Sequence, residues 1–347
     1  MAKFRVGADI GGTFTDLVLL GHDGTLHTKK VPSTVGAYEV AIVEGLSSVF
    51  DSAGLQPDQI EEVLHGTTVA SNAILEHKGA RTGLITTKGF RDVLEIRTLR
   101  MPRLYDLHWE KPPPLAPRYL RLDVDERINN KGGVDKALDL DEVERVVQRL
   151  LDEKVETIAV CLIDSYANDS HERAIKGVIE RMAPDLLHCI SADVLPEILE
   201  YQRTSTTVIN AYVMPIVSNY LQQLSARLGA AKIDAPLLLM QSNGGLINAA
   251  VAERKPANII ESGPAGGVVG AQALARKLDT EIVSADSLQV YRFFDIGTAK
   301  PTLSVREEIP HHLIDILDPD EEFNAFDFKT RALKIIRELI DRDKIPI

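Results

Sequence analysis

The sequence predicts an α/β fold, and three segments support this prediction. Within residues 4–20, two apolar runs flank Gly11-Gly12, which is the pattern of a β-hairpin with a tight glycine turn. Residues 141–163 begin with helical spacing and acidic residues and end in an apolar run, which indicates a helix followed by a buried strand. In residues 262–278, a glycine-rich stretch leads into a helix of small residues. Helices and strands are therefore mixed throughout the chain.

The other elements follow in order along the chain. Pro215 falls inside one expected helix and should kink or interrupt it, because proline lacks the N–H that a helix needs. Residues 111–117 are rich in proline and are expected to form an exposed connection. Helices are expected at residues 38–51, 89–96, 141–153, 169–181, 204–228, 268–278 and 323–342, and strands at 4–10, 15–20, 82–86 and 157–163.

The loop of the N-terminal hairpin has the composition of a phosphate-binding turn. Gly11 and Gly12 carry no Cβ, so the backbone can approach an anion closely. Successive N–H groups, together with the hydroxyls of Thr13 and Thr15, would form a concave nest for phosphate oxygens. The same residues would also fit an ordinary hairpin with threonines at the surface.

Two carboxylates flank this loop. Asp9 and Asp16 are placed to hold a hydrated Mg²⁺ or to orient a water, because Mg²⁺ usually takes one or two carboxylates together with substrate phosphates. Aspartates that only cap the hairpin are the alternative. The complete pattern DIGGTFTD at residues 9–16 favours phosphate binding, with Asp9 and Asp16 as candidate catalytic and metal-binding residues.

Two further segments are candidates for the same chemistry. His65 follows an apolar pair at the end of an expected strand, where its imidazole could face a cleft and act in catalysis. A histidine that is hydrogen-bonded for structural reasons is the commoner alternative. Gly263, Gly266 and Gly267 precede the helix expected at 268–278 and could bind an anion, or could permit close packing of that helix.

Several ordered motifs resemble one enzyme family. They are DIGGTFTD at 9–16, HGTTVASN at 65–72, EYQRTSTT at 200–207, MQSNGG at 240–245 and ESGPAGGVVG at 261–270. Together they resemble the hydantoinase A/5-oxoprolinase/acetone carboxylase β-subunit family of actin-like and sugar-kinase type ATPases. The resemblance implies ATP and Mg²⁺ as cofactors, and either opening of a cyclic amide of the hydantoin or 5-oxoproline type or carboxylation of a small carbonyl compound. It also implies a hydantoinase B-type partner subunit.

The resemblance stops near residue 280. In that family, a second Asp-x-Gly-Gly-Thr loop follows the glycine-rich helix and clamps the phosphates from the other side. No such loop occurs in residues 281–347. The sequence therefore predicts an incomplete ATPase fold, whose ATP site is open on one side and which is catalytically incomplete by itself.

The tail resembles a different family, the tRNA dimethylallyltransferases. The matching motifs are SADSLQVYR at 284–292, DIGTAKP at 295–301, IPHHLID at 309–315 and DP at 318–319. The resemblance implies that Asp286 is a catalytic base for an adenine amine, whereas an aspartate that caps a helix fits the local sequence equally well. The lysine of the P-loop that such an enzyme needs upstream is missing from residues 263–270. The tail is expected to be a fragment of a P-loop-type α/β domain.

The chain is expected to divide into residues 1–185, the hydantoinase/oxoprolinase N-terminal domain; 186–280, the start of the hydantoinase A domain; and 281–347, the transferase-like fragment. Three functions remain open. They are an ATP-dependent hydrolase of cyclic amides or related carboxylase subunit, a tRNA dimethylallyltransferase, and an inactive fusion remnant.

Composition limits the location and the partners. The net charge of −12 and the acidic stretch 318–322 make tRNA an unexpected ligand. The sequence contains no long uncharged apolar run, and its first residues do not predict a signal peptide. Membrane association is therefore not expected. Cys161 and Cys189, the two cysteines, are expected to be buried thiols of a cytoplasmic protein.

Overall fold

The computed structural model describes residues 3–347 except 12, 35, 99–107, 109 and 294–299. The chain forms two compact units, Met1–Gly263 and Pro264–Ile347, each described below by itself. Both contain helices and strands, so the predicted α/β class is confirmed.

A six-stranded sheet forms one part of the first unit. Its strands are, in spatial order, β12 (Leu246–Asn248), β11 (Leu237–Met240), β4 (Ile60–Thr67), β1 (Phe4–Ile10), β2 (Phe14–Gly21) and β3 (Leu26–Pro32). The predicted hairpin is the antiparallel pair β1–β2, and β3 extends it. On the other side, β1 runs parallel to β4, and β4 runs parallel to β11. Therefore β1, β4 and β11 end at the same edge of the sheet.

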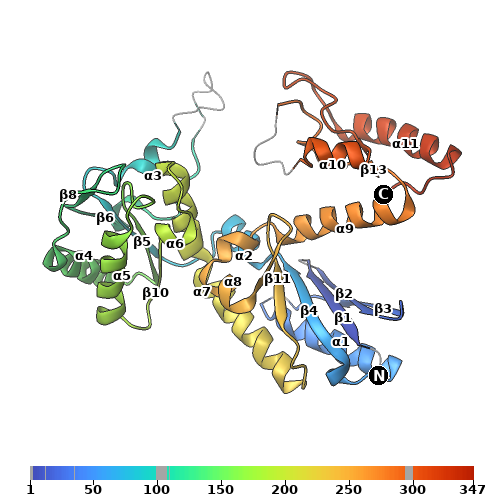
Figure 1. Cartoon of the computed structure of the whole chain (residues 1–347), viewed down its shortest axis with the longest axis horizontal. Coiled ribbons are helices and arrows are strands. Elements are labelled where there is room, and N and C mark those ends of the chain that lie inside the picture. Colours follow the sequence, from blue (N-terminus) through green and yellow to red (C-terminus); the bar gives the residue numbers. More distant parts are fainter. Residues whose placement is uncertain (1–2, 12, 35, 99–107, 109, 294–299) are drawn as a thin grey trace. The chain divides into compact units, whose positions relative to one another are not determined.

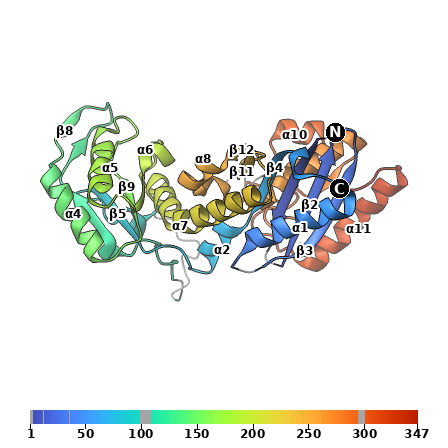
Figure 2. The same cartoon turned by 90° about the horizontal axis from the view of Figure 1, so that it is seen from below.

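Alternation along β1 and β2 determines which face of this sheet is covered. In both strands every second side chain is buried, as expected of strands with one face on a core. Helix α1 (Tyr38–Ala53) packs on the buried face, as Figure 2 shows. The core between them includes Val6, Leu17, Leu19, Ile42 and Leu46.

The second sheet of this unit is entirely parallel. Its order is β10 (Leu187–Ile190), β9 (Thr157–Cys161), β5 (Thr82–Thr87) and β6 (Arg121–Val124). Every residue of β5 and β9 is buried, which is typical of parallel strands covered on both faces. Helices α4 (Leu140–Asp152) and α5 (Ser170–Met182) cover one face (Figure 1). The other face packs against α7 (Glu200–Ala230) and α3 (Val93–Ile96).

Helix α7 joins the two sheets. Its first half packs Val208, Ala211 and Met214 on the second sheet, and its second half packs Val217 and Leu221 on the first. The helix runs without interruption through Pro215, contrary to the break that the sequence allowed. Apolar side chains on both sides of the proline are held in cores, and this packing outweighs the lost backbone hydrogen bond.

Short elements complete the first unit. They are helices α2 (Val69–Leu75), α6 (Ser191–Val194) and α8 (Ala249–Arg254), the pair β7 (Arg127–Ile128) and β8 (Val134–Lys136), and the 3₁₀ helices Pro57–Gln59, Arg118–Leu120 and Pro256–Ile259. The proline-rich segment 111–117 forms neither helix nor strand, as predicted, although Ala116 within it is buried.

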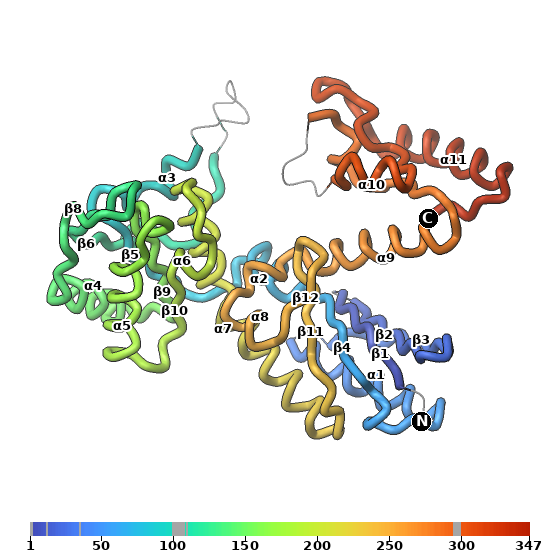
Figure 3. The backbone as a smooth tube through the Cα atoms, in the orientation of Figure 1, coloured from blue at the N-terminus to red at the C-terminus, as the bar shows by residue number. Residues whose placement is uncertain are grey.

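The second unit is a small α/β body. Helix α9 (Ser262–Leu278) leads into it, followed by β13 (Ile282–Val283), α10 (Leu303–Glu308), β14 (His311–His312) and α11 (Ala325–Asp341), whose path Figure 3 traces. Strands β13 and β14 are parallel, and Ala275, Ile282 and Ile309 form the core. The buried Glu281 carboxylate accepts hydrogen bonds from Arg342 (2.8 and 3.1 Å) and Lys344 (3.2 Å), and lies 2.7 Å from His312 Nε2.

Helices α9 and α3 begin at other residues than predicted, for identifiable reasons. Helix α9 begins at Ser262 instead of residue 268, so the glycine-rich segment is helical. Pro264 fits there because the first turn of a helix does not use its N–H groups. Helix α3 spans only Val93–Ile96 of the predicted 89–96, since Gly89 has a left-handed φ of 88°.

Candidate functional site

The N-terminal hairpin places its two carboxylates on one face. Asp9 and Asp16 are directly opposite each other in the antiparallel register, and residues paired in this way share a face of the sheet. Both lie on the exposed face. Thr15 lies on the opposite face, where its buried hydroxyl is 2.9 Å from Ser33 Oγ. The structure therefore brings the two aspartates together and does not bring the Thr15 hydroxyl to them.

The charge on this face is only partly balanced. Burial, with a further contribution from the negative charge of Asp16, raises the pKa of Asp9. Lys30 on β3 donates to both Asp16 oxygens at 3.0 Å, but both groups are exposed, so this pair is weak. Two adjacent carboxylates, one of them partly desolvated, form an arrangement that a divalent cation would stabilise.

The hairpin loop is braced from the end of β3. The Gly11 N–H donates to Phe14 O at 2.9 Å, so it serves the turn and does not point freely at a ligand. Ser33 donates from its hydroxyl to Gly11 O and from its N–H to Thr13 O, both at 2.9 Å. Thr13 is exposed, and Gly12 lies outside the described residues. Ser33 was not identified from the sequence because it belongs to none of the motifs.

Two glycines line the space beside Asp9. A Cβ added to Gly66, at the end of β4, would lie 3.1 Å from Asp9 Oδ1, and one on Gly263 would lie 3.9 Å from it. Ser262, which is buried, clamps this region, since its hydroxyl donates to Thr67 O at 2.8 Å and accepts from Thr67 N at 3.0 Å. Thus the first residues of α9 meet the ends of β1 and β4, and Gly263 lies beside Asp9.

The structure places His65 in the core of the first sheet. Its Nδ1 lies 3.0 Å from Ala8 O, and its Nε2 lies 2.6 Å from the Tyr220 hydroxyl. Burial lowers the pKa of His65 to about 4, so the ring is neutral at physiological pH. The neutral ring fits as a donor to Ala8 O and an acceptor from Tyr220. This arrangement corresponds to the structural role that the sequence left open, and it does not place the imidazole at a cleft.

Three predicted site residues fall in the second unit. Gly266 and Gly267 lie within helix α9. Asp286 is exposed, and its Oδ1 accepts from Leu288 N at 2.7 Å and Gln289 N at 3.0 Å. Asp286 therefore caps the turn that follows it, which is the alternative role left open for this residue.

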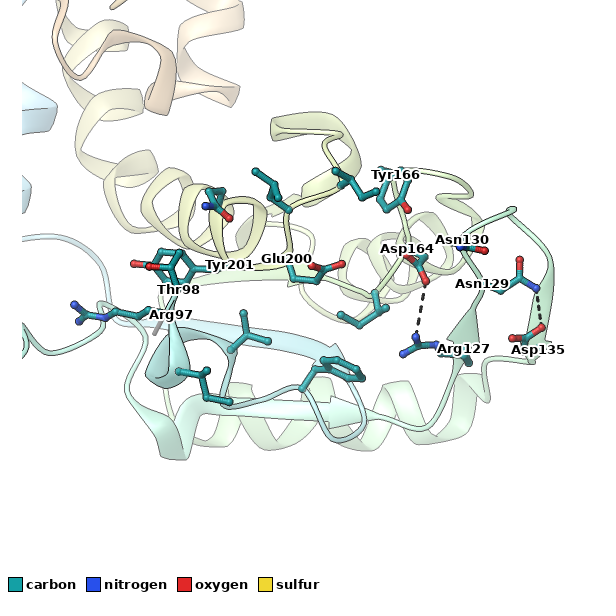
Figure 4. Close-up of a pocket in the computed structure, with 17 residues that line it drawn as sticks. Arg97, Thr98, Arg127, Asn129, Asn130, Asp135, Asp164, Tyr166, Glu200 and Tyr201 are labelled. Atoms are coloured by element: carbon teal, nitrogen blue, oxygen red, sulfur yellow. Dashed lines mark hydrogen bonds and ion pairs between the residues drawn. The ribbon is translucent and has the colours of Figure 1, made fainter. Parts of the chain in front are cut away.

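A pocket at the second sheet was not anticipated from the sequence. It has a volume of about 990 Å³ and lies where the parallel strands β5, β6 and β9 end (Figure 4). Arg127 and Asp164 face each other in it, with Arg127 Nη2 3.8 Å from Asp164 Oδ2. Asp164 has a left-handed φ of 55°, which is uncommon for a residue other than glycine.

The loop that carries Asp164 is held firmly from beneath. Arg203, which is fully buried in α7, donates to Ser165 Oγ at 2.5 Å and to Leu162 O at 2.8 Å. The Ser165 hydroxyl also donates to Leu162 O at 3.0 Å. These bonds fix the backbone on both sides of Asp164.

The described residues offer neither a cluster of metal ligands nor a membrane-spanning helix. Among them, no three His, Cys, Asp or Glu side chains are grouped so that they could hold a metal ion. No helix within the described part is long and apolar enough to cross a membrane. A Mg²⁺ site needs no such cluster, because two carboxylates suffice where phosphates and water supply the other ligands.

Three family models match the chain in sequence order. Residues 5–183 match the hydantoinase/oxoprolinase N-terminal region, and residues 203–287 match the hydantoinase/oxoprolinase model. Residues 289–347 match the IPP transferase model. A tRNA dimethylallyltransferase of Syntrophobacter fumaroxidans is 54% identical over 93 residues, 26% of this chain and 27% of that protein. The matched stretch is longer than the 67 residues of 281–347. The similarity to the transferase therefore begins upstream of Glu281, where it overlaps the similarity to the hydantoinase/oxoprolinase model.

The larger part is similar to subunits of named enzymes, and two solved structures that it resembles are described as those of ATP-dependent enzymes. The α subunit of caprolactamase from Pseudomonas jessenii is 35% identical, covering 76% of this chain and 39% of that protein. The γ subunit of acetophenone carboxylase from Aromatoleum aromaticum is 30% identical, covering 81% of this chain and 40% of that protein. The ATP-dependent caprolactamase structure from Pseudomonas jessenii matches with a TM-score of 0.74 at 32% identity, over 81% of this chain and 42% of that one. Nucleotide-free acetone carboxylase matches with a TM-score of 0.75 at 25% identity, over 82% of this chain and 42% of that one. The chain thus spans about two-fifths of the length of these relatives.

Proposed function

The chain belongs to the hydantoinase/oxoprolinase family, and we propose that its first unit carries a phosphate-binding hairpin for ATP-dependent opening of a cyclic amide or carboxylation of a small carbonyl compound. The observation that carries the proposal is the shared exposed face of Asp9 and Asp16, with the pKa of Asp9 raised. The position of the loop, at the edge where β1, β4 and β11 end, supports an actin-like ATPase type of sheet.

Each residue of this site has a distinct role. Asp9 and Asp16 would hold a hydrated Mg²⁺, which offsets their mutual repulsion. Thr13 would contribute its exposed hydroxyl to phosphate oxygens. Gly66 and Gly263 keep the space beside Asp9 free of side chains. Bound ATP would supply the phosphoryl group that converts a substrate oxygen into a leaving group.

We further propose that this chain turns over ATP slowly when alone. Phosphoryl transfer depends mostly on positioning and charge stabilisation, and no second Asp-x-Gly-Gly-Thr loop occurs in residues 281–347. The IPP transferase similarity of the tail does not lead us to propose tRNA prenylation. Asp286 is engaged in capping a turn, and residues 263–270 contain no lysine.

A partner and a compartment complete the proposal. Two relatives are named as subunits of larger enzymes, which supports a hydantoinase B-type partner for this chain. Cys161 and Cys189 are both buried and unpaired, which supports the reducing cytoplasm.

The experiment is calorimetric titration of the chain with ATP in the presence and absence of Mg²⁺. Asp9→Asn should weaken Mg²⁺-dependent ATP binding at least about tenfold, equivalent to about 1.4 kcal/mol. Glu62→Gln is the matched control, since Glu62 on β4 is a carboxylate on the same face of the sheet. It pairs at 3.1 Å with Arg5, which lies four residues before Asp9 on β1. Equal affinities for wild type and Asp9→Asn would refute the proposed site.

A further inference from the structure

The pocket at the second sheet has the chemistry of a second ligand site, and it is built from residues outside the phosphate hairpin. We propose that it binds a small molecule with an apolar body and an amide group, whose oxygen accepts from Arg127 and whose N–H donates to Asp164. A cyclic amide is a molecule of this kind, so the proposal deepens the proposed function. Only the identification of the ligand as a cyclic amide rests on that function.

The polar end of the pocket can bind an acceptor and a donor side by side. The 3.8 Å between Arg127 Nη2 and Asp164 Oδ2 is an ion-pair distance and is too long for a hydrogen bond. A ligand group that offers both an oxygen and an N–H can therefore bond to the two side chains at once. Figure 4 shows Arg127 and Asp164 pointing toward each other, with Glu200 and Tyr201 nearer the other end. Arg127 is further oriented by Phe90, whose ring centroid lies 5.3 Å from the guanidinium carbon.

Part of the remaining wall is apolar and suits an apolar body, although Arg97, Thr98 and Glu200 also line the pocket. Ile96, Ile198 and Leu199 line the pocket, and each is more than half exposed, at 56%, 62% and 51%. Large apolar side chains gathered around one cavity indicate a surface that a ligand covers. Covering them would contribute binding energy that is independent of the polar contacts.

The backbone at the polar end is already fixed in its conformation. Asp164 has a left-handed φ of 55°. Arg203 holds the backbone on both sides of it, because its guanidinium donates to Leu162 O and to the Ser165 hydroxyl. Backbone strain of this kind is concentrated at ligand sites, where rigid positioning lowers the entropy lost on binding. Arg127 comes from β7 and Asp164 from the loop after β9, so the paired groups are presented by two separate elements.

The test is titration of the whole chain with ε-caprolactam, followed by saturation-transfer NMR of the ligand. N-methyl-ε-caprolactam is the matched probe, because it has the same ring and lacks the N–H. Wild type should bind the lactam saturably and the methylated probe more weakly. Arg127→Gln and Asp164→Gly should each weaken lactam binding at least about tenfold, since each removes one hydrogen bond to a charged group. Glycine is chosen because it adopts a positive φ without strain. Asp164→Asn is the second variant should the first not fold; its amide oxygen still accepts the N–H but carries no charge, so it should weaken binding by a smaller factor.

Two controls separate this proposal from the proposed function. Arg145 on helix α4 forms an ion pair of similar length, with its Nη2 3.9 Å from Asp139 Oδ2. Arg145→Gln removes this pair and should leave lactam binding unchanged. Asp9→Asn should also leave it unchanged while weakening Mg²⁺-dependent ATP binding. The inference is overturned if wild type shows no saturable binding, or if the Arg127 and Asp164 variants bind as wild type does. Lactam binding that is lost only in Asp9→Asn would place the amide at the hairpin and retain the proposed function.

Discussion

The buried imidazole of His65 should make the stability of the first unit depend on pH above the range in which carboxylates titrate. Burial lowers the pKa of His65 from 6.5 to about 4. Between pH 6.5 and 4, His65 is protonated in the unfolded chain and neutral in the folded chain. The folded state therefore loses stability as the pH falls toward 4. A fall from 6.5 to about 4 corresponds to about 3 kcal/mol in total, of which about 2 kcal/mol should be lost between pH 7 and pH 5.

The perturbation that isolates this effect is His65→Gln. A glutamine amide can still donate to Ala8 O and accept from the Tyr220 hydroxyl, but it does not titrate. The free energy of unfolding would be measured by urea denaturation at pH 7, 6 and 5, followed by far-ultraviolet circular dichroism. The variant should be less stable at pH 7 and should lack the fall of about 2 kcal/mol between pH 7 and pH 5.

His27→Gln is the control, since His27 is a partly exposed histidine on β3 of the same sheet. It should retain the wild-type dependence on pH. If His65→Gln also retains it, the imidazole of His65 is not held neutral in the core, and the structural role assigned to it is wrong.

Three other outcomes test separate parts of the structure. Asp16→Asn should lower the pKa of Asp9, measured by carboxyl carbon NMR, because the charge of Asp16 is one of the two causes that raise it; an unchanged pKa would mean that the two groups do not share a face. Gly79→Ala should lower the free energy of unfolding by about 1–3 kcal/mol in urea denaturation, since its Cβ would lie 2.0 Å from Tyr212 Cε1; an unaffected variant would contradict this close packing. In the second unit, the pKa of Glu281 is lowered to about 2, mainly by hydrogen bonding from Arg342. The Glu281 carboxylate therefore stabilises the unit above pH 4.5, and this stability is lost as the pH falls toward 2. Glu281→Gln should remove that loss in acid unfolding followed by amide exchange, and an unchanged acid transition would argue against the cluster.

Local patterns predicted the elements that local sequence determines. The β1–β2 hairpin was predicted from its glycines and flanking apolar runs, and Asp9 and Asp16 are opposite each other because the loop length sets the register. Helix α7 shows the limit of such patterns. The sequence marks Pro215 as a break, but two cores that form only in the folded chain hold the helix on both sides of it.

Contacts between distant segments could not be predicted in this way. His65 was left between two roles because its partner Tyr220 is 155 residues away in sequence. Ser262, which clamps Thr67 across 195 residues, stands in a glycine-rich motif whose anion-binding and packing roles could not be separated. The pocket with Arg127 and Asp164 was missed because its lining comes from separate segments that no single motif contains.

The most direct test of the central claim is NMR of the chain with Mn²⁺·ATP, since the paramagnetic ion broadens signals near the metal. We predict selective broadening of the amide signals of Asp9, Thr13 and Asp16, and its loss in Asp9→Asn. The amides of Arg5 and Glu62, on the same sheet but about 13 Å away along the strand, should be broadened much less. Uniform broadening, or broadening that persists in Asp9→Asn, would contradict a metal–phosphate site at the hairpin.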